Sequence, residues 1–150
     1  MNSIIECVRN YIMDFPELDE NRCLLVEYLG DKAIEYTVEA TPCDPIYKQY
    51  TDGEKVKQFE FIFASRQYFS ADVNTCIDNL HFYEKFEDWI EGNNDNGVLP
   101  DLGESRTPVS LEVLTKGYAL SAEADTARYQ IQLRLIYEEV KNVNENSTTP

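Results

Sequence analysis

The apolar residues near the N-terminus recur with the period of an α-helix. Between Ser3 and Phe15 they fall on one face at about 100° per residue, and polar residues occupy the opposite face. Ser3 suits the N-cap position, because its hydroxyl accepts from a backbone N–H of the first turn, and Pro16 ends the helix. The pattern predicts a helix over residues 3–15 that packs one side on a core.

Strict alternation of apolar and polar residues predicts strands in the rest of the chain. It is cleanest from Tyr129 to Tyr137, where every second residue is apolar. Turn residues at 30–32 and 121–125 separate neighbouring strands. The predicted strands cover residues 24–29, 33–41, 55–65, 109–120 and 126–138.

Residues 70–92 predict a second, longer helix. Ser70 or Asp72 would cap it and Gly92 would end it. A helix that is apolar around most of its surface is buried on more than one side. The second half of this helix therefore either enters a deep part of the core or is covered by another molecule. One stripe consists of Val73, Cys76, Ile77 and Leu80, and the opposite side of Phe82, Phe86 and Trp89.

Three segments show no periodicity. Residues 42–53 contain two prolines and a glycine and predict a loop. Residues 93–108 form a longer polar stretch, which is either a disordered insertion or an arm that contacts a partner. Residues 141–150 form a polar tail that we expect to be disordered.

The order of elements favours an α+β fold. Strands joined by short turns, with only two helices between them, predict a mostly antiparallel sheet of about five strands with both helices packed on one face. Residues 1–140 then form one domain. The opposite sheet face is polar, which suits either solvent or a polar partner.

The charge balance restricts the partners. The chain carries 28 acidic and 13 basic residues, a formal net charge of −15. Binding to a nucleic-acid backbone or to anionic lipid needs a basic patch, and the sequence has no Lys/Arg cluster. We therefore expect neither specific nucleic-acid binding nor membrane binding. An acidic surface suits solubility, a basic partner or a wall that repels polyanions.

The sequence offers little for catalysis or metal binding, and we expect no enzyme activity, cofactor or metal. The four cysteines form no CxxC pair, and His81 is the single histidine. Phosphate-binding glycine motifs are absent. Residues 93–97 resemble a calcium loop only superficially, because they lack the EF-hand spacing and its closing glutamate. With neither a signal peptide nor a membrane span expected, the cysteines are predicted to be reduced in a cytoplasm.

Three stretches together resemble a known family. They are SRQYFS (65–70) leading into residues 78–91, LPDLG (99–103) before residues 109–120, and residues 127–139. They are similar to the tail terminator, or tail completion, proteins of long-tailed bacteriophages and Gram-positive prophages, which are minor structural proteins. The resemblance covers residues 1–140 and includes no catalytic signature.

The resemblance implies a structural role in the virion. Tail terminators are α+β proteins that form hexameric rings. Such a ring caps the tail tube and offers the surface for head–tail joining, so its partners are the tail-tube protein and a head-completion or neck protein. The expected location is the head-proximal end of the tail, and the host cytoplasm during assembly. DNA passes through the ring without being bound.

A head-to-tail ring needs two different contact surfaces on each subunit. Large aromatic residues dominate such contacts, and the long polar loop is a further source of them. The hypothesis assigns the subunit interface to Phe82, Phe86, Trp89, Leu99 and Leu102. The alternatives are an acidic inhibitor of another protein, such as a DNA mimic, or another neck protein of the head–tail junction.

Overall fold

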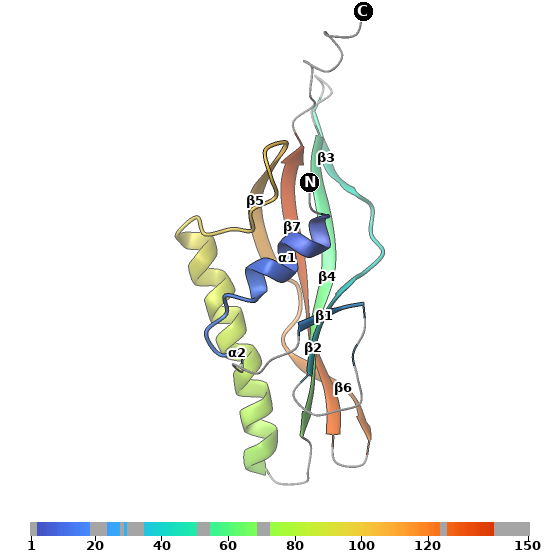
Figure 1. Ribbon diagram of the computed structural model, residues 1–150, viewed down its shortest axis with the longest axis vertical. Coiled ribbons are helices and arrows are strands. Elements are labelled where there is room, and N and C mark those ends of the chain that lie inside the picture. The colour runs from blue at the N-terminus through green and yellow to red at the C-terminus, as the bar shows by residue number, and fades with distance from the viewer. Residues whose placement is uncertain are drawn as a thin grey trace, which may run out of the picture.

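The computed structural model describes residues 3–18, 24–27, 29, 35–50, 55–68, 73–123 and 126–139 (Figure 1). It confirms an α+β fold with a mostly antiparallel sheet. The predicted tail, residues 141–150, lies outside the described residues. The elements are α1 (Ile4–Ile12), β1 (Leu24–Val26), β2 (Glu35–Ala40), β3 (Ile46–Gln49), β4 (Lys55–Tyr68), α2 (Val73–Asp95), β5 (Arg106–Val113), β6 (Tyr118–Glu123) and β7 (Thr126–Glu139).

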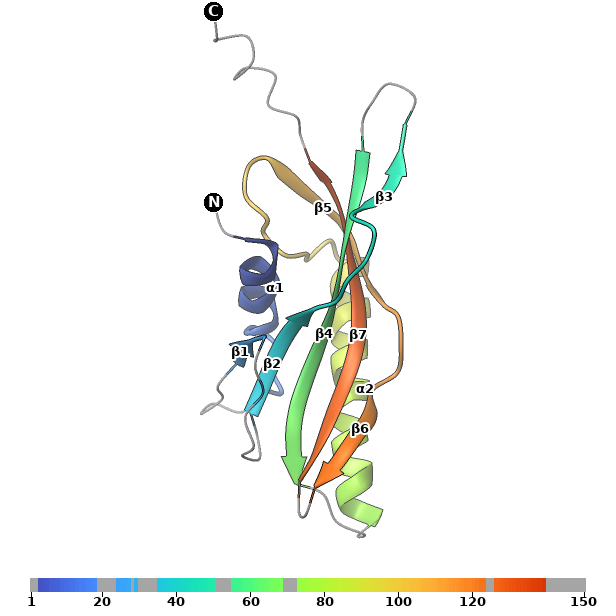
Figure 2. The same cartoon turned by 90° about the vertical axis from the view of Figure 1, so that its right-hand side faces the viewer.

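Two long central strands organise the sheet. β4 and β7 have 14 residues each and pair antiparallel from Val56–Glu138 to Tyr68–Thr126. β2 and β3 follow one another along the other edge of β4, and β5 and β6 do the same along the other edge of β7 (Figure 2). The sheet is therefore long and narrow.

The pairing of β1 corrects one expectation. A turn at residues 30–32 would join neighbouring antiparallel strands, but β1 pairs with β2 in parallel, with Leu24 opposite Tyr36. Parallel neighbours need a crossover rather than a hairpin. Residues 30–32 lie outside the described residues. On the other side of β1, the Arg9 Nε of α1 donates to the Leu24 carbonyl at 2.8 Å.

One loop prediction and one strand prediction also need correction. The segment 42–53 contains β3, which pairs with the start of β4 through a bulge. The segment 109–120 is not one strand, because it is interrupted at residues 114–117 between β5 and β6, although the Leu114 N–H still donates to the Gln132 carbonyl at 2.8 Å. There the Thr115 side chain replaces a backbone partner and accepts from the Gln132 N–H at 3.1 Å.

Both helices cover the same face of the sheet (Figure 2). The N-terminus of α1 confirms the predicted cap, because the Ser3 hydroxyl accepts from the Glu6 N–H at 3.3 Å. The core lies between the helices and the inward side chains of the central strands. These side chains include Val8, Ile12 and Phe15, then Phe61 and Phe63, then Tyr83, Phe86 and Ile90, then Ile131, Leu133 and Leu135.

The end of α2 lies further along the chain than predicted. The helix passes Gly92 and runs to Asp95. Gly97 has a φ of 73°, its N–H bonds to the Asn94 carbonyl, and the Val98 N–H bonds to the Asn93 carbonyl. This pair of bonds is the Schellman arrangement that commonly closes a helix at a glycine. The segment that resembled a calcium loop is therefore a helix C-terminus.

The loop after α2 is ordered and packed, which excludes a disordered insertion over residues 96–105. Leu102 is fully buried, and the Tyr11 hydroxyl donates to the Val98 carbonyl at 2.9 Å. Asn93 in turn donates to the Tyr11 hydroxyl. The loop thus ties α2 to α1.

Candidate interaction surfaces

The structure places the predicted aromatic interface residues in and around the core. Phe86 is 0% exposed, and its ring lies 5.2 Å from that of Phe15. Trp89 and Phe82 are partly buried and also contact the Phe15 ring. The sheet covers one side of α2, and Phe15, which follows α1, covers the adjacent side. Phe86 is therefore a core residue and not an interface residue, whereas Phe82 and Trp89 keep partly exposed surface and their interface assignment stays a prediction.

Of the two loop leucines, burial excludes Leu102 from a subunit interface, and the assignment of Leu99 stays a prediction. Leu102 is 0% exposed, and its carbonyl accepts from the Arg106 Nε at 2.9 Å. Leu99 is partly buried and packs against the core. Since Leu102 is enclosed by its own subunit, it has no surface to offer a neighbour.

Six of the nine large hydrophobic residues that are exposed among the described residues lie at the two ends of the long sheet, and the other three are Val26, Val98 and Val109. At one end, which we call the tip, β3 leads into β4. Tyr47 and Tyr50 are 47% and 43% exposed there. Lys48 and Lys55 are exposed beside them, and the Lys48 Nζ lies 5.0 Å from the centre of the Tyr50 ring. The tip therefore carries aromatic residues and lysines, together with Glu138 and Glu139 at the end of β7, of which Glu139 pairs with Lys57.

The other end, which we call the base, holds one tyrosine and several aliphatic residues. It lies where β4 ends, α2 begins and β6 pairs with the start of β7 (Figure 1). Tyr68 and Leu120 are both more than half exposed. Ile77 and Leu80, which the sequence placed on one stripe of α2, are 56% and 40% exposed. That stripe turns away from the core.

The same stripe of α2 continues upwards as carboxylates. Ile77, Leu80, Glu84, Asp88 and Glu91 are three or four residues apart, so they share one face of the helix. All five are exposed. We call this set the outer face of α2. It is apolar near the base and acidic beyond it.

The sheet face opposite the helices carries a network of paired polar groups. Arg128 binds Glu39 through both terminal nitrogens, at 2.8 and 3.3 Å, and Arg134 binds Glu112 at 3.3 Å. The Tyr118 hydroxyl accepts from both Gln130 and Gln132. These pairs join neighbouring strands side by side. Because the ion pairs are partly exposed, each contributes about 0–1 kcal/mol to stability.

The groups considered for catalysis lie apart from one another. The His81 side chain is 56% exposed and lies 3.5 Å from Glu84 on the same helix. Burial raises the pKa of the Cys7 thiol, so the protonated form is favoured. Cys23 lies outside the described residues. Within the part of the chain that the structure describes, no group of three His, Cys, Asp or Glu side chains is placed to hold a metal ion.

A buried hydroxyl cluster joins α2 to the sheet. The Tyr83 hydroxyl lies 2.5 Å from the Ser65 Oγ and donates to the Tyr129 carbonyl at 3.0 Å. Complete burial strongly raises the pKa of Tyr83, so its hydroxyl stays neutral. Its position fixes where α2 crosses the sheet.

Comparison with known proteins adds no family to this description. The sequence matches no protein-family model and no curated protein. Among the described residues, none of the helices has the length and apolar character needed to cross a membrane.

Proposed function

We propose that the protein is a structural subunit of the tail terminator type, which assembles head to tail with copies of itself into a ring that caps a phage tail tube. One observation carries the proposal. The subunit is elongated and exposes large apolar side chains at two opposite ends, with Tyr47 and Tyr50 at the tip and Tyr68, Ile77, Leu80 and Leu120 at the base. Two unlike surfaces at opposite ends are what a heterologous contact requires.

The charge supports the same function. A ring through which DNA passes must not hold phosphate groups, and a net charge of −15 repels them. The arginines of the open sheet face do not reverse this, because Arg128 and Arg134 already bind Glu39 and Glu112. This face therefore presents paired rather than unpaired positive charge.

The test combines the protein with the tail-tube protein encoded in the same genome. Mass photometry of the protein alone and with the tube protein measures ring formation, and electron microscopy measures tube length and the density at the tube ends. We expect a closed oligomer at tube ends and tubes that stop growing once it is added. Tubes that elongate unchanged, with a protein that stays monomeric in both mixtures, would contradict the proposal.

A second candidate is an inhibitor that imitates nucleic acid. The outer face of α2 favours it, because Glu84, Asp88 and Glu91 form a row of exposed carboxylates. Such a protein binds a basic nuclease or repressor in a complex that salt dissociates. Replacing the three carboxylates by glutamine or asparagine would then abolish that complex. An unchanged complex would contradict this candidate.

A further inference from the structure

We propose that Asn96 is a site of spontaneous deamidation, at which the Gly97 backbone nitrogen attacks the Asn96 side chain and solvent water completes the conversion to aspartate or isoaspartate. The inference is independent of the self-assembly proposed above, because it concerns a chemical change within one chain. It assigns a modification site at the end of α2 and an effect of the modification on the contacts of that helix.

The reaction balances with water as its only co-reactant. The Gly97 nitrogen loses its proton and forms a bond to the Asn96 Cγ, and the side-chain nitrogen takes up that proton and leaves as ammonia. The product of this step is a cyclic succinimide. Water then opens the ring. Opening at the side-chain carbonyl gives aspartate, and opening at the main-chain carbonyl gives isoaspartate, whose main chain runs through the former side chain.

Asn96 precedes the residue that hinders this attack least. Asn96–Gly97 is the single Asn-Gly pair of the sequence. Glycine has no Cβ, so no side chain shields the Gly97 nitrogen. The space around it is also open, because a Cβ atom built on Gly97 would meet no residue beyond its chain neighbours within 4 Å. The other described asparagines are followed by Tyr11, Thr75, Leu80, Asn94 and Asp95.

The Asn96 side chain is accessible and free to turn. Asn96 and Gly97 are both exposed. Among the described residues no hydrogen bond involves the Asn96 side chain, whereas the side chains of Asn93 and Asn94 bond to Tyr11 and Leu111. The end of α2 lies at the side of the molecule away from β3 (Figure 1).

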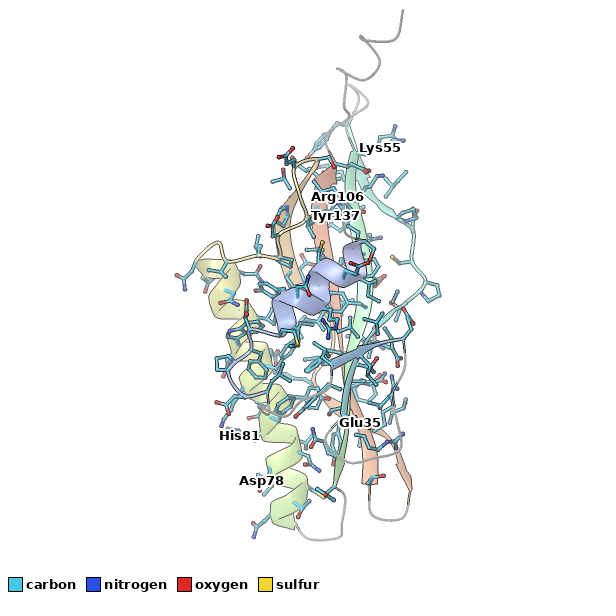
Figure 3. All side chains as sticks on the ribbon, in the orientation of Figure 1. Glu35, Lys55, Asp78, His81, Arg106 and Tyr137 are labelled. Carbon is cyan, nitrogen blue, oxygen red and sulfur yellow. The ribbon has the colours of Figure 1, made fainter. Side chains whose placement is uncertain are left out.

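The earlier turns of α2 extend away from this site towards the base. Figure 3 labels Asp78 and His81 on them. Those turns continue the helix on one side of Asn96 only, so the reacting pair lies at its free end. Terminal turns of a helix open more readily than interior turns.

The helix cap slows the reaction without preventing it. The Gly97 N–H donates to the Asn94 carbonyl at 3.2 Å, and this bond must open before the nitrogen can attack. The Asn96 N–H donates to the Gly92 carbonyl at 3.1 Å and holds Asn96 in the last turn. The rate in the folded protein is therefore the rate of the open helix end, multiplied by the fraction of molecules in which that end is open.

Isoaspartate at position 96 would disrupt the closure of the helix. Its main chain is one atom longer, so the Val98 N–H no longer aligns with the Asn93 carbonyl. Both products also place a carboxylate at the C-terminus of α2, where the helix dipole disfavours negative charge. Because the Val98 carbonyl accepts from the Tyr11 hydroxyl, the change loosens the contact of α2 with α1.

The test incubates the purified full chain at mildly alkaline pH and follows each asparagine by peptide mass spectrometry, which detects the replacement of an amide by a carboxylate. We expect Asn96 to convert at least about tenfold faster than any other described asparagine, which corresponds to a barrier lower by about 1.4 kcal/mol. Incubation in urea is the positive control. Conversion should be faster there, because the helix end is open.

Two variants separate the reaction from its effect. Asn96→Gln keeps an exposed amide, but attack by the next nitrogen would have to close a larger ring, so the fast conversion should be lost. Asn96→Asp carries the charge of the products on an ordinary main chain. Hydrogen exchange of the Val98 amide should be faster in the isoaspartate form than in either variant.

Each contrary outcome rejects a stated part of the inference. Conversion of Asn96 in urea but not in the folded chain would overturn the site, and so would conversion of another described asparagine at the same rate. Exchange of the Val98 amide that is equal in the isoaspartate form and the fresh protein would overturn the effect on the helix end. None of these results depends on ring formation.

Discussion

Gly117 packs directly on the side chain of Tyr83. A Cβ atom at position 117 would lie 2.3 Å from the Tyr83 Cβ and 2.6 Å from its Cγ. The segment between β5 and β6 therefore approaches α2 as closely as a backbone can. Tyr83 is held in turn by Ser65 and by the Tyr129 carbonyl, so it cannot move aside.

Gly117→Ala is expected to destabilise the protein. The added methyl group must push the 114–117 segment away from α2, which costs about 1–3 kcal/mol by the usual penalty for overpacking. Urea unfolding measures the loss. Gly92→Ala is the matched control: its Cβ meets nothing within 4 Å, and alanine in a helix interior should stabilise by about 0.5–1 kcal/mol. Equal effects of the two substitutions would contradict the close packing at Tyr83.

Asn94→Ala is expected to open the edge of β5. The Asn94 side chain accepts from the Leu111 N–H at 2.9 Å and donates to the Leu111 carbonyl, so it replaces a neighbouring strand. Its loss leaves two backbone groups without partners and costs about 1–2 kcal/mol. Hydrogen exchange of the Leu111 amide should become faster. The next residue, Asp95, cannot take over both bonds, because an ionised carboxylate has no N–H to donate. Unchanged exchange would therefore contradict the role of Asn94.

Tyr83→Phe is expected to change the response to alkali. Burial raises the pKa of Tyr83, so the folded protein keeps the proton at a pH where the unfolded chain, with a tyrosine pKa near about 10, releases it. The wild-type free energy of unfolding is therefore unaffected by this group below pH ~10 and falls as pH rises further, by about 1.4 kcal/mol per pH unit for each proton.

The variant lacks this proton and should lose stability less steeply above pH ~10. At neutral pH it should be less stable by about 1–2 kcal/mol, because the Tyr129 carbonyl loses its donor. Urea midpoints at a series of mildly to strongly alkaline pH values measure both effects. Parallel curves for the two proteins would show that Tyr83 does not determine the alkaline limit.

Phe86→Ala tests whether Phe86 stabilises the core or belongs to an interaction surface. Phe86 is fully enclosed, so its removal should cost about 3–5 kcal/mol of unfolding free energy. Ile77→Ser with Leu80→Ser should leave the melting temperature nearly unchanged, since both side chains are exposed, but should weaken self-association. A stable Phe86→Ala variant would return that residue to the interface hypothesis.

Features that depend on neighbouring residues in the chain could be predicted from the sequence. Features that depend on residues distant in the chain could not. The helix cap at Ser3 and the alternation in β7 depend on neighbours in the chain, and both were confirmed. The parallel pairing of β1 depends on a partner strand that no local pattern specifies. The close approach of Gly117 to Tyr83, within the break between β5 and β6, joins two residues that are distant in sequence.

The candidate surfaces were harder to predict, because exposure depends on what covers a helix. The sequence separated two apolar sides of α2 correctly, but gave no reason to prefer either for the core. The segment that follows α1 determines which side is buried, because the Phe15 ring packs against Phe82, Phe86 and Trp89. The stripe of Ile77 and Leu80, which sequence reasoning left aside, is the exposed one.

The pairing of β4 with β7 also determines how the subunit bears a load. Thirteen registered positions join these strands, and their hydrogen bonds lie across the strand direction. A pull between tip and base would act on all of these bonds in shear at once rather than opening them one by one. The subunit is thus stiffest along the axis on which its two ends would transmit tension.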